Sequence, residues 1–156
     1  NMENKENNLG IFKELTDKVT AINKENCALK LEVQSVREAG HREMMETLRD
    51  IISIFDVFER AKTLITEKGW DASEEGQKVR DRFLNVEKQL IKKLEQHGVK
   101  EIPIEIGSVV DDFLCSVCDT EPDLSKENDT IISVEKKGYT YNGAVLRPAD
   151  VVIVKN

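Results

Sequence analysis

The stretch FKELTDKVTAINKENCALKLEVQSV, residues 12–36, decides the fold of this chain because its apolar side chains recur every seven residues. One seam position, a, carries Phe12, Val19, Asn26 and Val33, and the other, d, carries Leu15, Ile22, Leu29 and Val36. β-Branched residues at a with Leu and Ile at d favour two parallel helices, and a seam Asn can fix their register. The stretch predicts a parallel coiled-coil homodimer. One amphipathic helix packing within its own chain is the alternative.

The predicted helix continues beyond this stretch with a change of spacing. An eleven-residue step leads from Val33 past Gly40 to Met44. Heptad spacing then resumes, which adds four residues to the predicted dimer interface: Leu48, Ile51, Phe55 and Phe58. An insertion of four residues locally unwinds a left-handed supercoil without ending the helix. We therefore expect one continuous helix over residues 9–68.

A second, shorter helix is predicted after Gly69. The segment Asp71-Ala72-Ser73-Glu74 has the spacing of a capping box in which Asp71 is the N-cap. Apolar residues at helical spacing follow, and His97-Gly98 is typical of a glycine C-cap. The end of the first helix and this returning helix, doubled by dimerisation, would form a four-helix bundle.

The last third of the chain reads as short strands. Residues 130–136 alternate as a strand does, and residues 151–154 form a last apolar strand. Between them, Asn142-Gly143 predicts a type I′ turn that joins residues 139–141 to residues 144–146. The expected class is α+β. Its expected divisions are a disordered N-terminus (1–8), a coiled-coil rod (9–50), a helical-bundle hairpin (51–98) and a β-domain (99–156).

Composition argues against several classes of function. The net charge is −7, and an acidic chain without a basic stripe is a poor candidate for binding nucleic acid. No apolar run approaches the roughly 20 residues that span a bilayer, so we expect no membrane partner. The three cysteines form an odd set with no visible signal peptide, which indicates a reducing compartment.

No pattern in the chain points to catalysis. Cys115 and Cys118 have the spacing of a redox motif, but no helix is predicted after them. The other typical soft ligands, His41 and His97, are expected on a helix surface and in a last helical turn. No phosphate loop, nucleophile elbow or two-His metal motif is present. We expect a protein that is not an enzyme, uses no cofactor or small-molecule substrate, and acts by binding another protein.

Three motifs resemble those of the GrpE family. The segment at 56–61, DVFERA, resembles the family's D-x-[LF]-[DE]-R-A signature, and His97-Gly98-Val99 is similar to its helix-to-head junction. The most specific match is KGYTYNGAVLRPA at 137–149, which looks like K-G-Y-x-x-x-G-R-V-[LI]-R-P-A. Ala144 stands where the family usually has Arg, and Asp150 where it has Met. The chain therefore resembles a divergent member.

The resemblance implies a co-chaperone of the heat-shock response. GrpE proteins are homodimeric nucleotide exchange factors that bind the ATPase domain of a DnaK-type chaperone, open its nucleotide cleft and accelerate ADP release. Carried onto this sequence, the expected partner-binding residues are Arg60, Arg147, Val151 and Ile153. The expected compartment is the bacterial cytoplasm, or an organelle of bacterial descent if a transit peptide was removed.

Two other classes of function stay open on the sequence. A coiled-coil scaffold or adaptor would have the same rod and would leave ADP release from the chaperone unchanged. A thiol-redox protein would depend on Cys115 and Cys118, and replacing both by Ser would abolish its activity.

Overall fold

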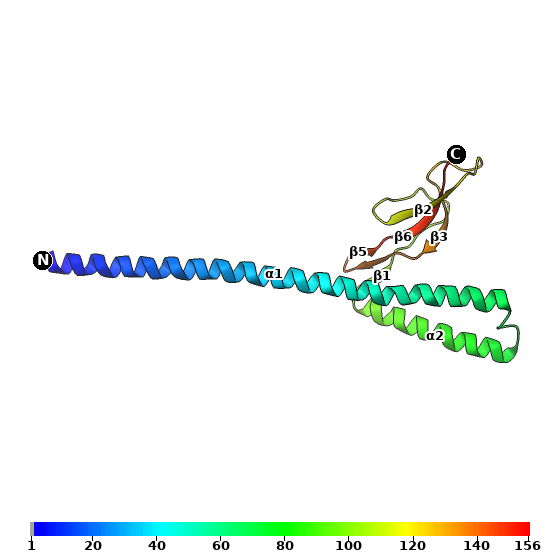
Figure 1. Ribbon diagram of the computed structural model, residues 1–156, viewed down its shortest axis with the longest axis horizontal. Helices are drawn as coiled ribbons and strands as arrows, with labels where there is room; N and C mark the ends of the chain where they lie inside the picture. The colour runs from blue at the N-terminus through cyan, green and yellow to red at the C-terminus, as the bar shows by residue number, and fades with distance from the viewer. Residues whose placement is uncertain (1) are drawn as a thin grey trace. The chain divides into compact units, whose positions relative to one another are not determined.

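The computed structural model describes residues 2–156 and has the α+β architecture that the sequence predicts (Figure 1). Two helices are followed by six strands: α1 (Met2–Lys68), α2 (Glu74–Gln96), β1 (Val99–Glu101), β2 (Cys115–Glu121), β3 (Ile131–Lys136), β4 (Tyr139–Tyr141), β5 (Ala144–Arg147) and β6 (Ala149–Val154). The chain divides into two compact units, residues 1–44 and 45–156.

The first unit is a single helix, the N-terminal part of α1. It passes through Gly40 without a break, so the prediction of one continuous helix is confirmed. It begins at Met2 and not near Leu9, so residues 2–8 are helical where the sequence predicted a disordered N-terminus; Asn1 lies outside the described residues. Every side chain from Lys5 to Met44 is exposed, including the predicted apolar seam.

The second unit opens with two helices that lie side by side (Figure 1). Phe58 of α1 contacts Phe83 of α2, with 4.8 Å between ring centroids. The start of α2 differs from the prediction. Ser73 is the N-cap, because its side chain accepts a hydrogen bond from the Gly76 amide at 3.0 Å. Asp71 instead forms an ion pair with Arg80 at 2.7 Å.

The strands form two three-stranded sheets. In the first, β4 lies between β1 and β5 and is antiparallel to both. In the second, β6 lies between β2, to which it is parallel, and β3, to which it is antiparallel. The β4–β5 turn has positive φ at Asn142 (49°) and Gly143 (85°), the signature of the predicted type I′ hairpin.

The two sheets have separate cores. The first sheet packs on the helices, and its core combines side chains of α1 and of strands β1, β4 and β5: Leu48, Ile52, Phe55, Val99, Tyr139 and Leu146. The second sheet has a core of its own: Cys115, Ile131, Ala149, Val151 and Ile153. We call the strand-containing part of the chain, residues 99–156, the head. The first sheet is therefore the part of the head that packs against the helices.

This arrangement corrects part of the predicted dimer interface. Leu48 and Phe55 are buried within their own chain, where the first sheet and not a second chain covers them. Phe58 also packs against this core, and Ile51 is only half-buried. Heptad spacing identifies an apolar face, and here the head of the same chain covers it.

Candidate functional site

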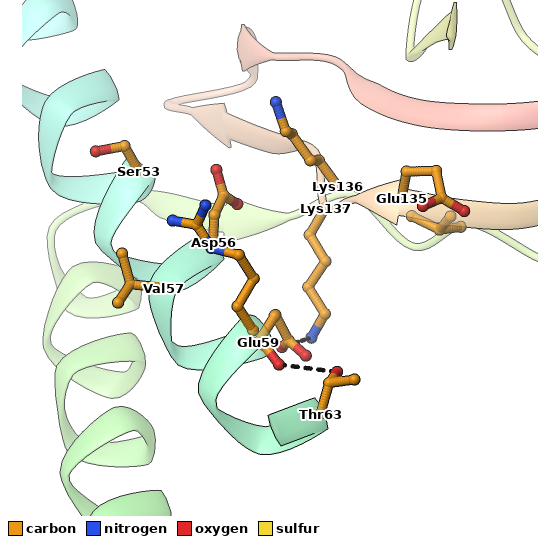
Figure 2. A pocket seen from close by; sticks show the side chains of 10 residues that line it. Ser53, Asp56, Val57, Glu59, Thr63, Glu135, Lys136 and Lys137 are labelled. Carbon is orange, nitrogen blue, oxygen red and sulfur yellow. Dashed lines mark hydrogen bonds and ion pairs between the residues drawn. The ribbon is translucent and has the colours of Figure 1, made fainter. Parts of the chain in front are cut away.

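The second unit contains a charged cleft between α1 and β3, lined in part by the motif at 56–61 (Figure 2). Its volume is about 700 Å³. Residues of α1, of β3 and of the loop before β4 line it: Ser53, Asp56, Val57, Glu59, Arg60, Thr63, Val134, Glu135, Lys136 and Lys137. Small-molecule sites are mostly enclosed and apolar. An open cleft with this many charged groups is better suited to binding the surface of another protein than to enclosing a small molecule.

One side of the cleft is closed by a bidentate ion pair. Arg147, at the end of β5, donates to both carboxylate oxygens of Asp56 on α1, at 2.7 and 2.8 Å. The same guanidinium donates to the Lys137 carbonyl at 2.8 Å and lies over the Tyr139 ring, 5.7 Å from its centroid. The five donors of a guanidinium allow this combination of contacts, which a Lys could not make.

A chain of ion pairs runs outward from Glu59 and Lys137, which both line the cleft. Glu59 binds Lys62 at 2.7 Å and Lys137 at 3.4 Å, and Figure 2 shows the contact with Lys137. Lys62 continues to Glu87 of α2 at 3.1 Å, and Lys137 continues to Glu101 of β1 at 3.4 Å. Burial alone raises the pKa of the Glu59 carboxyl, but its hydrogen bond with Lys62 and the charge of Lys137 outweigh burial and lower the pKa.

Arg60 is the cation of this cleft that the described residues leave unpaired. It is exposed on α1, and Asp56, its nearest helical candidate for an ion pair, is taken by Arg147. Lys136 reaches Asp150 at 3.8 Å, a long surface contact. The guanidinium of Arg60 is therefore free to meet an acidic group from outside the chain.

Two of the four predicted partner-binding residues are buried, and a third is engaged within the chain. Val151 and Ile153 are 0% and 5% exposed in the core of the second sheet, because these positions of the central strand β6 face inward. Arg147 is engaged by Asp56 and by the Lys137 carbonyl. Arg60 alone keeps an exposed, unpaired side chain.

Sequence reasoning did not single out Asp56 and Lys137 as site residues. Both lie inside quoted motifs, at 56–61 and 137–149, so the signal was present. What the sequence could not show is that the two motifs meet, since Arg147 and Asp56 are 91 residues apart.

A second exposed surface lies on the two helices. Apolar side chains of α1, the connecting turn and α2 are left at the surface: Ile54, Leu64, Trp70, Val79 and Val86. Part of this surface is a shallow groove in which Trp70 and Val79 lie with the half-buried Phe83. Contiguous exposed apolar surface of this kind marks an interaction site.

Cys115 and Cys118 lie on β2, whereas Cys27 is exposed on α1. Cys115 is buried, and Cys118 donates a hydrogen bond through Sγ to the Val151 carbonyl at 3.3 Å. Within residues 2–156 no cluster of three His, Cys, Asp or Glu side chains is arranged to hold a metal ion. In the same part of the chain, no helix combines the length and the apolar character needed to cross a membrane.

Comparison with known proteins identifies the family to which this chain belongs. The sequence model of the GrpE family matches residues 1–155. The chain belongs to the GrpE family. The family that the sequence motifs predicted is thereby confirmed.

Individual relatives agree with this membership. The mitochondrial GrpE protein homologue of Neurospora crassa is 28% identical over 130 residues, which cover 79% of this chain and 54% of the relative. Protein GrpE of Prochlorococcus marinus strain MIT 9313 is 33% identical over 103 residues, 66% of this chain and 41% of the relative. Protein GrpE of Francisella tularensis is 28% identical over 153 residues, 93% and 75% respectively. The chain spans about half the length of the first relatives it matches.

Proposed function

We propose that this protein is a nucleotide exchange factor that binds the ATPase domain of a DnaK-type heat-shock chaperone as a parallel homodimer. The observation that carries the proposal is the match of nearly the whole chain to the GrpE family. The exposed rod, the exposed helical surface and the free cation of the cleft supply the surfaces that this function needs.

The rod supports a parallel dimer through its charges as well as its seam. Heptad position g carries Glu25 and Glu32, and position e carries Lys30 and Arg37. In a parallel, in-register pair, Glu25 of one helix meets Lys30 of the other, and Glu32 meets Arg37. An antiparallel pair would set like charges against each other. The parallel arrangement is therefore favoured.

The exposed apolar surface of α1 and α2 supports the same assembly. Two copies brought together along this surface would bury Leu64, Trp70 and Val79, which are exposed in one chain. The result would be a four-helix bundle with a head attached to each half. Burial of such side chains stabilises an assembly by about 1.5–3 kcal/mol each.

Nucleotide exchange requires that binding of this protein and binding of ADP to the chaperone be coupled. This protein makes or breaks no covalent bond in the process. The exchange factor binds the open cleft of the chaperone more tightly than the closed one, so ADP must bind more weakly by the same factor. A head held on a helical support can act as the wedge that makes this distinction. In this proposal the chain contributes contacts, and no residue of it takes part in ATP hydrolysis.

The central experiment is stopped-flow release of a fluorescent ADP analogue from the cognate chaperone. We expect micromolar concentrations of this protein to accelerate release. No acceleration, with a dimer still present, would reject the proposal in favour of a scaffold or adaptor. The relatives are bacterial and mitochondrial, and we propose the bacterial cytoplasm as the compartment.

Replacing Arg60 by Ala is expected to weaken binding to the nucleotide-free chaperone by roughly 10- to 100-fold. A hydrogen bond to a charged group contributes about 1.5–3 kcal/mol, and each 1.4 kcal/mol is about tenfold in affinity. The dissociation constant can be measured by surface plasmon resonance or fluorescence anisotropy. Fold and dimer should be unchanged, since Arg60 makes no ion pair within the described residues.

Arg42→Ala is the matched control for this variant. Arg42 is also an exposed arginine of α1, but it lies outside the cleft. It should bind the chaperone as the wild type does. Equal affinities of Arg60→Ala and wild type would show that Arg60 does not contact the partner.

A further inference from the structure

Two polar contacts attach β5 to α1, and the ion pair of Glu59 with Lys137 is a third contact between α1 and the head. Arg49 donates through Nε to the Leu146 carbonyl of β5 at 2.9 Å. Seven residues further along the helix, Asp56 accepts both hydrogen bonds from Arg147. At 1.5 Å per residue the two points are about 10 Å apart along the helix axis. Two anchors at this separation prevent rotation of β5 about either one.

The ion pair between Asp56 and Arg147 is shielded enough to contribute to this attachment. Their side chains are 22% and 20% exposed, whereas exposed surface pairs contribute little. The geometry is bidentate, which fixes orientation as well as distance. Beneath the pair, the Phe55 and Tyr139 rings stack with centroids 5.9 Å apart. We name the pair of Asp56 and Arg147 the clamp.

The clamp also lies next to the start of the second sheet. Arg147 ends β5, Pro148 follows, and β6 begins at Ala149 as the central strand of that sheet. The ring of Pro148 restricts the backbone at this corner. The Arg147 guanidinium also holds the Lys137 carbonyl, which lies just after β3. Arg147 thus contacts α1 at Asp56, ends a strand of the first sheet and lies two residues before the central strand of the second.

We propose that Asp56 and Arg147 are positioning residues that hold the head at a fixed angle to the helices, so that it favours the open chaperone cleft over the closed one. This inference rests on the proposed function. A rigid head fits one state of the cleft. A loosened head can adapt to both states, so the difference in its affinity for them falls, and with it the coupling to ADP release.

The test uses Asp56→Asn, which nearly keeps the side-chain volume and removes the charge, in the full-length protein. Two quantities are separated: the maximal rate of ADP release at saturation, and the concentration that gives half of that rate. We expect the maximal acceleration to fall about tenfold, as for loss of about one charge-assisted hydrogen bond. The half-saturating concentration should change less than about threefold, because the contact surface is intact.

Three further variants make the test specific. Asp56→Glu keeps a carboxylate and should restore most of the acceleration. Arg147→Gln combined with Asp56→Asn should be no worse than Arg147→Gln alone, because the change at 56 then removes no further interaction. Asp50→Asn removes an exposed carboxylate from the same helix and should leave the rate unchanged.

Head mobility provides a readout that does not depend on the chaperone. Spin labels on Lys92→Cys of α2 and Ser116→Cys of β2 report the distance between helix and head, with the native cysteines changed to Ser. Both positions are exposed. We expect a narrow distance distribution in the wild type and a broad one in Asp56→Asn, while circular dichroism shows that both remain folded.

The outcomes separate the two proposals. If the wild type accelerates release and Asp56→Asn accelerates it equally, the positioning role is wrong, whatever the width of the distribution. If Asp56→Asn unfolds, Asp56→Glu and Arg147→Gln alone decide: equal rates of ADP release with these two variants would overturn the inference. If Asp56→Asn folds, additive effects at 56 and 147 would overturn it. A wild type that does not accelerate release at all rejects the proposed function itself.

Discussion

Replacing Phe55 by Ala is expected to destabilise the second unit by about 3–5 kcal/mol, the usual effect of removing a buried phenylalanine. Phe55 is 2% exposed and lies where α1 meets the first sheet, stacked on Tyr139. The cavity would open at the layer that joins head and helices. Amide hydrogen exchange of β4 is the local measurement, and its protection should fall roughly 10²- to 10³-fold.

Phe113→Ala is the matched control, because Phe113 is a phenylalanine of the same unit that is 88% exposed. A surface substitution of this kind changes stability by about 0.5 kcal/mol or less. The contrary outcome is also informative. If Phe55→Ala dissociated the dimer while β4 stayed protected, Phe55 would belong to the seam between chains, as its heptad position alone suggests.

Phe55 shows where sequence reasoning stops. Its spacing from Leu48, Ile51 and Phe58 correctly predicts a helix with an apolar face. The same spacing contains no information about what covers that face. A second copy of the helix and a sheet from the same chain both bury apolar side chains at these positions. Only the structure shows that the head covers Leu48 and Phe55.

Features encoded by neighbouring residues were predictable, and those that join distant segments were not. Asn142-Gly143 forms the expected turn because positive φ at both positions is a local property. The N-cap of α2 was misplaced by two residues, since Asp71 and Ser73 are both good caps and tertiary contact with Arg80 decides between them. The clamp was not predictable, because the sequence does not show that residues 56 and 147 meet.

From the exposed apolar seam of the rod we predict a second large effect: Leu29→Asp should dissociate the proposed dimer. Leu29 occupies position d and is 50% exposed in the single chain. In a parallel dimer two copies of the leucine would meet, each contributing about 1.5–3 kcal/mol, and two carboxylates would replace them. We expect the dissociation constant to rise roughly 10²- to 10⁴-fold, measured by sedimentation equilibrium.

Leu31→Asp is a control of the same chemistry on the same helix. Leu31 lies two residues further along, on the outer face at position f, and is 64% exposed. In the single chain the two leucines are thus similarly accessible, and only a partner helix distinguishes them. Dissociation by Leu29→Asp alone would place the partner on the seam. Equal effects of the two changes would mean that no helix packs on this seam, and the rod would need another explanation for its apolar stripe.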